Sequence, residues 1–175
     1  MPTIFAHAVV PLALAAASGR TIVPPRLALV GAAFAIVPDL DVVSFRLGID
    51  YADSWGHRGA THSLVFAALC AGVVALLWRD ARSWLGWAFL TLSMASHGLL
   101  DTLTDGGLGA ALWWPFSEAR VFAPVKPVRV SPIGANFFSA QGLETLASEV
   151  KWIVLPCLAL AMAGWTTRRA APARP

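Results

Sequence analysis

The chain has little charge and few residues that build disulfides or thiolate metal sites. Only 13% of its 175 residues are Asp, Glu, Lys or Arg, whereas 57% are hydrophobic and the mean hydropathy is +0.65. A soluble domain of this length cannot bury so much apolar surface. The two cysteines, Cys70 and Cys157, both lie in apolar runs and form no CxxC motif, so we expect no disulfide framework. The composition indicates a membrane protein.

The sequence also lacks a clustered basic face, although its net charge is +3. Its arginines and lysines are scattered between apolar runs, so we expect no nucleic-acid partner. The amino terminus has neither the positive region nor the small-residue cleavage site of a secretory signal, and its apolar run contains His7. We therefore expect this run to remain in the mature protein.

Apolar runs predict an all-α fold, an integral membrane helix bundle of about five transmembrane helices in a single domain over 1–166. A helix needs about 20 residues to cross the hydrocarbon core, and all runs but the first come near that length. The first contains Pro11, which a membrane helix tolerates when neighbours satisfy the freed carbonyl. The predicted segments are about 3–18, 27–45, 62–78, 84–101 and 150–166, and Pro38 is expected to bend or end the helix of the second.

A long connection, 102–149, separates the fourth predicted segment from the fifth. It contains the interfacial tryptophans of "ALWWPF" and the proline-punctuated stretch "APVKPVRVSPIG". We expect this connection to lie on the membrane surface and cap the bundle. Residues 167–175 are predicted to form a disordered basic tail.

The positions of the basic residues predict the orientation of the bundle. With a cytoplasmic carboxyl terminus, the inner stretches 19–26, 79–83 and 167–175 hold seven of the 13 Lys and Arg residues, although they are short. The positive-inside rule favours this orientation. It places the other ends of the helices on the outer side of the membrane.

Four polar groups lie at these outer ends, one from each of the first four segments. If the helices alternate in direction, the groups meet at one membrane depth, and this holds for either orientation of the bundle. All four histidines of the chain belong to them. The groups are His7, the pair Asp39 and Asp41 in "VPDLDVV", the pair His57 and His62 with Arg58 in "HRGATHS", and His97 with Asp101 in "SHGLLDTLTDGG".

The residue types favour a divalent metal site. His97 and Asp101 are four residues apart, so they lie on the same face of a helix and can share one ion. Imidazole and carboxylate without thiolate suit zinc and also manganese or ferrous iron. The candidate ligands exceed the four of a closed zinc site, so either two ions bind or some residues support the ligands or act as a base. Alternatively, His7 is a packed histidine, and Asp39, Asp41 and Asp101 only cap helix ends.

The motifs "PDLD", "HRGATHSL" and "HGLLDTLTDGG", followed by "WWPFSEARVF", resemble the YdjM-like family of small bacterial and archaeal inner-membrane proteins. This family is described as membrane-bound metal-dependent hydrolases. The resemblance covers about residues 4–135 and implies an inner-membrane location and a metal site, but no particular substrate. The matched positions are His7, Pro38, Asp39, Asp41, His57, Arg58, Thr61, His62, Ser63, His97, Asp101 and Thr104.

Together these features predict a multi-pass, membrane-embedded hydrolase that cleaves an ester or phosphoester of a lipid with metal-activated water. One or two divalent ions, with zinc as the first choice, would be held by His7, Asp39, His62, His97 and Asp101. The predicted catalytic residues are Asp41 or His57 as general base and Arg58, which offsets developing negative charge. The alternatives are a transporter or ion pathway and a protein whose metal only joins helices. The confinement of the polar groups to one side of the bundle disfavours a relay across the membrane.

Overall fold

The computed structural model is all-helical over the residues it describes, 1–132 and 134–170. No strand occurs within this part of the chain, and its β-pairing is limited to two isolated bridges, Thr104 with Val128 and Ala110 with Val121. The α-helices are α1 (Ile4–Ser18), α2 (Pro25–Phe34), α3 (Leu64–Leu77), α4 (Trp84–Thr102), α5 (Ala140–Glu149) and α6 (Leu155–Ala170). Between them lie the 3₁₀-helices η1 (Val37–Leu47), η2 (Ala60–His62), η3 (Arg79–Ala81) and η4 (Gly134–Phe138) and the π-helix η5 (Val150–Val154).

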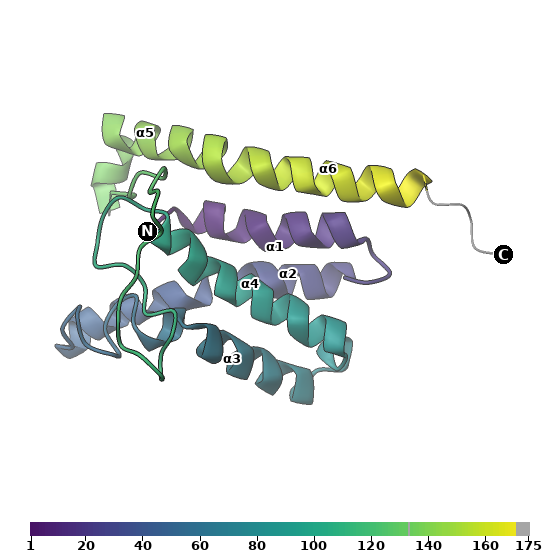
Figure 1. The fold of residues 1–175 in the computed structure, drawn as a ribbon, viewed down its shortest axis with the longest axis horizontal. Helices are drawn as coiled ribbons and strands as arrows, with labels where there is room; N and C mark the ends of the chain where they lie inside the picture. Colours follow the sequence, from purple (N-terminus) through teal and green to yellow (C-terminus); the bar gives the residue numbers. More distant parts are fainter. Residues whose placement is uncertain (133, 171–175) are drawn as a thin grey trace.

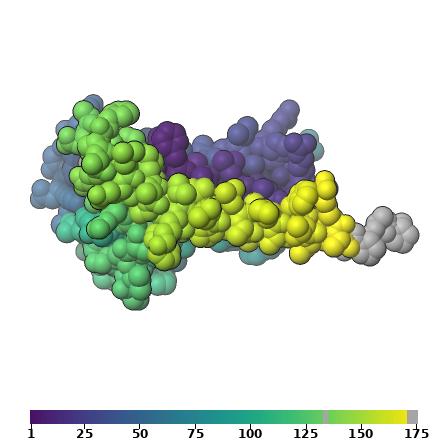
Figure 2. All heavy atoms as spheres, turned by 90° about the horizontal axis from the view of Figure 1, so that it is seen from above, coloured from purple at the N-terminus to yellow at the C-terminus, as the bar shows by residue number. Residues whose placement is uncertain are grey.

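The helices run roughly along the long axis of the molecule, as Figure 1 shows. The start of α1, the segment η1, the start of α3, the end of α4 and the long connection after it all lie at one end of the bundle (Figure 1). Seen from above, α5 and α6 extend along one face of the molecule (Figure 2). This alternation of direction brings the four polar groups of the sequence to the same end.

Local sequence features set the helix ends. Thr3, Ser63 and Ser83 cap α1, α3 and α4, because each side-chain oxygen accepts a hydrogen bond from a backbone amide three residues further on. The second apolar run was expected to continue to about residue 45 with a bend or end near Pro38. Instead α2 ends at Phe34, and the chain continues as the 3₁₀-helix η1, whose second residue is Pro38. Proline lacks an amide donor, so it favours such a break.

The carboxyl-terminal helix is longer than predicted at both ends. It begins at Ala140 rather than near 150 and is continuous through α5, η5 and α6 to Ala170, so the surface connection is shorter than 102–149. Of the predicted disordered tail, 167–170 is helical, and 171–175 lies outside the described residues. One contact holds this helix end against α1: Arg168 donates a hydrogen bond of 2.7 Å to the carbonyl of Ala16. Within α6, the guanidinium of Arg169 lies 4.0 Å from the centre of the Trp165 ring.

The exterior of the bundle is apolar. The buried core between α1, α2, α3 and α4 centres on Leu27, Phe89 and Leu90, while large side chains such as Leu77 on α3 and Met162 on α6 are 80% and 66% exposed. In a soluble protein, so much exposed apolar surface would promote association. Such a surface suits contact with lipid.

Two helical stretches are long and apolar enough to cross a membrane, Pro25–Leu47 and Ala140–Ala170, by length and composition. The apolar helices α1 and α3 have 15 and 14 residues. At 1.5 Å per residue such helices are only about 22 Å long, shorter than the ~30 Å hydrocarbon core. Length alone therefore supports a helical membrane bundle without fixing the number of crossings at five.

Candidate metal centre

Seven histidine and aspartate side chains lie together at the polar end of the bundle. They come from four separate parts of the chain: the second turn of α1, the 3₁₀-helix η1, the segment around η2 and the last two turns of α4. Each is at most 8% exposed. The set comprises His7, Asp39, Asp41, His57, His62, His97 and Asp101, the acidic and histidine residues that the sequence analysis singled out.

Asp101 lies at the centre of this cluster. Its Oδ2 is 3.3 Å from Nε2 of His62 and 3.9 Å from Nε2 of His97, and its Oδ1 is 3.9 Å from Nε2 of His7. The spacing of four residues between His97 and Asp101 does place both on one face of α4, as expected. Three imidazoles from three different elements therefore point toward one carboxylate.

His97 is oriented by the break that follows α2. Its Nδ1 lies 2.7 Å from the carbonyl oxygen of Ala35, which accepts the hydrogen bond when Nδ1 carries the proton. Its Nε2 then has a free lone pair and lies 3.2 Å from Oδ1 of Asp39. The ring also stacks on His7, with centroids 3.7 Å apart and an angle of 11° between the planes. A carbonyl acceptor on one nitrogen is the usual partner of a metal-binding histidine.

Asp41 contacts the Nδ1 atoms of two histidines, His57 and His62. Its Oδ1 is 2.6 Å from Nδ1 of His57, and its Oδ2 is 3.2 Å from Nδ1 of His62. The Thr61 hydroxyl and the backbone amide of Arg58 donate further hydrogen bonds to Oδ2, at 2.7 and 3.1 Å. Thr61 and Asp41 contact Nδ1 of His62, so its Nε2 faces Asp101. Asp41 thus orients both imidazoles.

Arg58 connects Asp41 to Asp101, because its backbone amide donates to the first and its side chain contacts the second. Its side chain is 1% exposed, and its Nε lies 3.0 Å from Oδ2 of Asp101. The guanidinium also donates to Thr104 Oγ1 at 3.2 Å and to the carbonyl of Gly106 at 2.9 Å. The structure therefore places Arg58 against Asp101 and the turn that follows α4, with its donors directed to protein groups.

Several ligand-type atoms of the cluster have no hydrogen-bond partner within the described residues, although they are buried. Buried polar atoms are satisfied in the great majority of cases, so such a concentration calls for an explanation. In addition, only one of the three carboxylates, Asp101, contacts a guanidinium, that of Arg58. The charges of Asp39 and Asp41 are therefore uncompensated if the histidines are neutral. A divalent cation would satisfy both deficits. The atoms concerned are both ring nitrogens of His7, both carboxylate oxygens of Asp39, Nε2 of His62, Nε2 of His97 and Oδ2 of Asp101, which has the ion pair with Arg58 but no hydrogen bond from the described residues.

The geometry offers three overlapping sets of ligands. In each set, one atom per residue lies within 4.8 Å of the others. The residues present thus fit a divalent metal, and the shared members allow one ion or two neighbouring ions. The sets are His7 with Asp39 and His97, Asp39 with His57 and His62, and His62 with His97 and Asp101.

Sequence reasoning missed two groups that hold the cluster in place. Glu149, the last residue of α5, is 3% exposed and accepts hydrogen bonds from the backbone amide and hydroxyl of Thr3, at 2.5 and 2.7 Å. Arg120 donates to the carbonyl of His57 at 2.7 Å and to that of Tyr51 at 2.8 Å. An acidic residue directly before an apolar helix was the available indication for Glu149; nothing in the spacing marks Arg120.

Fold and site together define a class: an all-helical membrane protein with a buried histidine–aspartate cluster at one end of an apolar bundle. The comparison with known proteins makes this assignment specific. The model of a family described as "YdjM inner membrane protein" matches residues 1–171, and the chain belongs to this family. The resemblance inferred from the motifs is thus confirmed, and the family indicates the inner membrane as the location.

A curated relative supports the same assignment. The chain is 41% identical over 174 residues to "Inner membrane protein YbcI" of Escherichia coli (strain K12). The aligned region covers 97% of this chain and 100% of that protein. No solved structure matches the chain.

Proposed function

We propose that the protein is a membrane-embedded metal-dependent hydrolase that cleaves an ester or phosphoester of a membrane lipid. The observation that carries the proposal is the set of buried, unpartnered nitrogen and oxygen atoms around Asp101. In the proposal, His62, His97 and Asp101 hold a divalent ion, with Asp39 and His7 completing its site or binding a second ion. Zinc suits these ligands best, and manganese or iron would also fit.

When bound, an ion of this kind lowers the pKa of coordinated water toward about 7. The protein's own residues would handle the proton. His57 is the histidine of the cluster nearest the surface, 7% exposed against at most 1% for the other three, and its Nδ1 is held by Asp41. Because His57 is the most accessible imidazole of the cluster and is oriented by a carboxylate, we assign it as general base and Asp41 as its positioning partner.

Arg58 has a different place in this proposal from the one expected from sequence. Because its guanidinium is directed to Asp101 and Thr104, we assign it the role of holding Asp101 and offsetting negative charge within the cluster. We also propose that five helical segments cross the inner membrane, that the carboxyl terminus is cytoplasmic, and that the cluster faces the outer side.

The proposal is tested with full-length protein purified without chelators and without a histidine tag. Elemental analysis should find one or two divalent ions per chain. Incubation with vesicles of phosphatidylethanolamine and phosphatidylglycerol should release fatty acid or a phosphorylated headgroup, and a chelator should stop the release. The variant His57→Asn should keep the metal and lose most turnover, since a general base contributes about 10²–10⁴-fold.

Asp80→Asn provides the control, because this exposed aspartate lies on η3, away from the cluster. It should retain both metal and turnover. Protein without metal would overturn the proposal outright. Metal-loaded protein that cleaves no lipid would assign the metal a structural role, and solute movement without cleavage would assign a transporter.

A further inference from the structure

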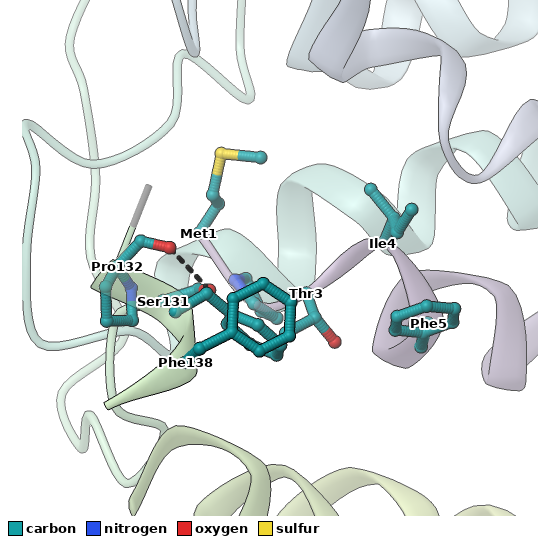
Figure 3. A pocket seen from close by; sticks show the side chains of 9 residues that line it. Met1, Thr3, Ile4, Phe5, Ser131, Pro132 and Phe138 are labelled. Atoms are coloured by element: carbon teal, nitrogen blue, oxygen red, sulfur yellow. Dashed lines mark hydrogen bonds between the residues drawn. The ribbon is translucent and has the colours of Figure 1, made fainter. Parts of the chain in front are cut away.

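An apolar cavity of about 330 Å³ opens beside the first turn of α1 (Figure 3). The side chains of Ile4, Phe5 and Phe138 stand around it in Figure 3, with Ser131 and Pro132 on the opposite side from Ile4. None of the described residues that line the cavity has a charged side chain. The lining consists of Met1, Pro2, Thr3, Ile4, Phe5, Ser131, Pro132, Phe137 and Phe138.

This cavity continues along α5. A second hollow of about 580 Å³ shares Phe137 and Phe138 with it and is otherwise lined by the first residues of α5, including Leu143 and Leu146. Leu143 is 70% exposed and Phe138 is 90% exposed, so the shared wall lies on the apolar exterior of the bundle. The two hollows adjoin at Phe137 and Phe138, and together they extend from the first residues of α5 to the start of α1. We refer to them together as the α1–α5 groove.

The inner end of the α1–α5 groove lies close to the His–Asp cluster. Its wall residue Thr3 accepts, through its carbonyl, the backbone hydrogen bond of His7 at 3.3 Å, so the cluster begins one helical turn away. Met1 lines the same cavity, two residues before Thr3.

We infer that the α1–α5 groove binds one acyl chain of a membrane lipid and thereby positions the polar part of that lipid near the cluster. The occupant follows from the surroundings, since the groove opens on the apolar exterior of a protein of the inner membrane, where acyl chains are the neighbouring molecules. A peptide would bring many backbone amides and carbonyls, whereas the polar side chains among the described lining residues are limited to the hydroxyls of Thr3, Ser131 and Ser139. The inference rests on the proposed function in one respect only, that the held lipid is the substrate.

Photolabelling tests the inference directly. Full-length protein is reconstituted into phosphatidylethanolamine and phosphatidylglycerol vesicles that contain a phosphatidylglycerol with a diazirine on one acyl chain. After illumination, labelled peptides are located by mass spectrometry. We expect labels concentrated on residues 1–5 and 137–146, above the level on exposed apolar residues elsewhere, such as Leu77 on α3.

Two variants sharpen the test. Ile4→Trp fills the cavity from its α1 side, and because each methylene kept out lowers binding roughly four-fold, we expect groove labelling to fall about ten-fold. Phe138→Ala removes a wall residue that is 90% exposed, so it should lower labelling without affecting folding. Leu29→Trp, at a 68% exposed position on α2, is the matched control and should leave labelling unchanged.

The outcomes separate this inference from the proposed function. Groove labelling that responds to Ile4→Trp supports the acyl-chain site even if the metal is absent or no lipid is cleaved. Labelling spread evenly over the lipid-facing helices, or unchanged in both Ile4→Trp and Phe138→Ala, would overturn the site. Metal-dependent cleavage that persists in such a case would leave the hydrolase proposal in place without the groove.

Discussion

Replacing Asp101 by asparagine is the most informative perturbation of the cluster, because this one carboxylate contacts a guanidinium and three imidazoles. The change keeps the shape of the side chain and removes its charge. If Asp101 is a metal ligand, metal affinity should fall by at least the ~10-fold that losing even a supporting contact costs. If Asp101 is only a helix cap, its loss should cost about 1 kcal/mol of stability and leave the metal content unchanged.

The contact with Arg58 predicts a second effect. The pair is buried, with 1% and 0% of the two side chains exposed, and Nε lies 3.0 Å from Oδ2. Removing one partner leaves a buried, uncompensated charge, which typically costs about 3–5 kcal/mol. The double variant Arg58→Met/Asp101→Asn removes both charges and should recover about 0.5–3 kcal/mol of that loss, the range by which contacting residues couple. It should not recover the metal.

Thermal unfolding in detergent, with and without a chelator, measures these quantities alongside elemental analysis. Chelation should lower the melting temperature of the unmodified protein, because metal at 1,000 times its dissociation constant stabilises by about 4 kcal/mol. Neither Asp101→Asn nor the double variant should respond to the chelator. Full metal content in Asp101→Asn, or a chelator response equal to that of the unmodified protein, would refute the placement of Asp101 at the metal.

Three further predictions follow from other parts of the molecule. Glu149→Gln should lower the melting temperature and weaken metal binding, because Glu149 fixes the start of α1; Glu149→Leu should be worse on both measures. Burial opposes ionisation of Asp105, but hydrogen bonds from Arg129 and a backbone amide lower its pKa below 3.8; its stabilisation is therefore present above that pH and lost as pH falls through the folded-state pKa. The melting-temperature difference between Asp105→Asn and the unmodified protein should accordingly vanish in acid. A carboxyl-terminal reporter should be cytoplasmic, while a cysteine at the 44% exposed Leu108 should react with an impermeant maleimide from the outer side.

The gathering of the cluster at one end of the bundle could be predicted from sequence. It requires only that apolar runs form helices of alternating direction, because the histidines and aspartates stand at run ends that then coincide. The spacing of His97 and Asp101 also predicted correctly that both lie on one face of a helix. These features are local or follow from the direction of the chain, so they need no knowledge of tertiary packing.

The sequence did not predict that Asp39 and Asp41 contact different histidines. The second apolar run was expected to be helical to about residue 45 with a bend or end near Pro38, whereas both aspartates lie on the 3₁₀-helix η1. With three residues per turn, side chains two apart point about 120° away from each other. Asp39 consequently faces His97, and Asp41 faces His57 and His62. Likewise Ala140–Glu149 lacks a continuous apolar run and was taken as part of a surface connection, which concealed Glu149.

The backbone conformation of Arg58 explains how Asp41 and Asp101 are connected. Its φ of 62° lies in the left-handed region, which costs a residue with a side chain about 1–3 kcal/mol unless the surroundings enforce it. Glycine would avoid this cost but would lose the guanidinium. In the observed conformation the amide of Arg58 donates to Asp41 while its side chain contacts Asp101, so one residue connects the carboxylate that orients His57 and His62 to the carboxylate at the centre of the cluster. This double contact explains the strained position. Lysine would supply the same amide and a positive charge, but not the guanidinium whose donors reach Asp101, Thr104 and Gly106 together.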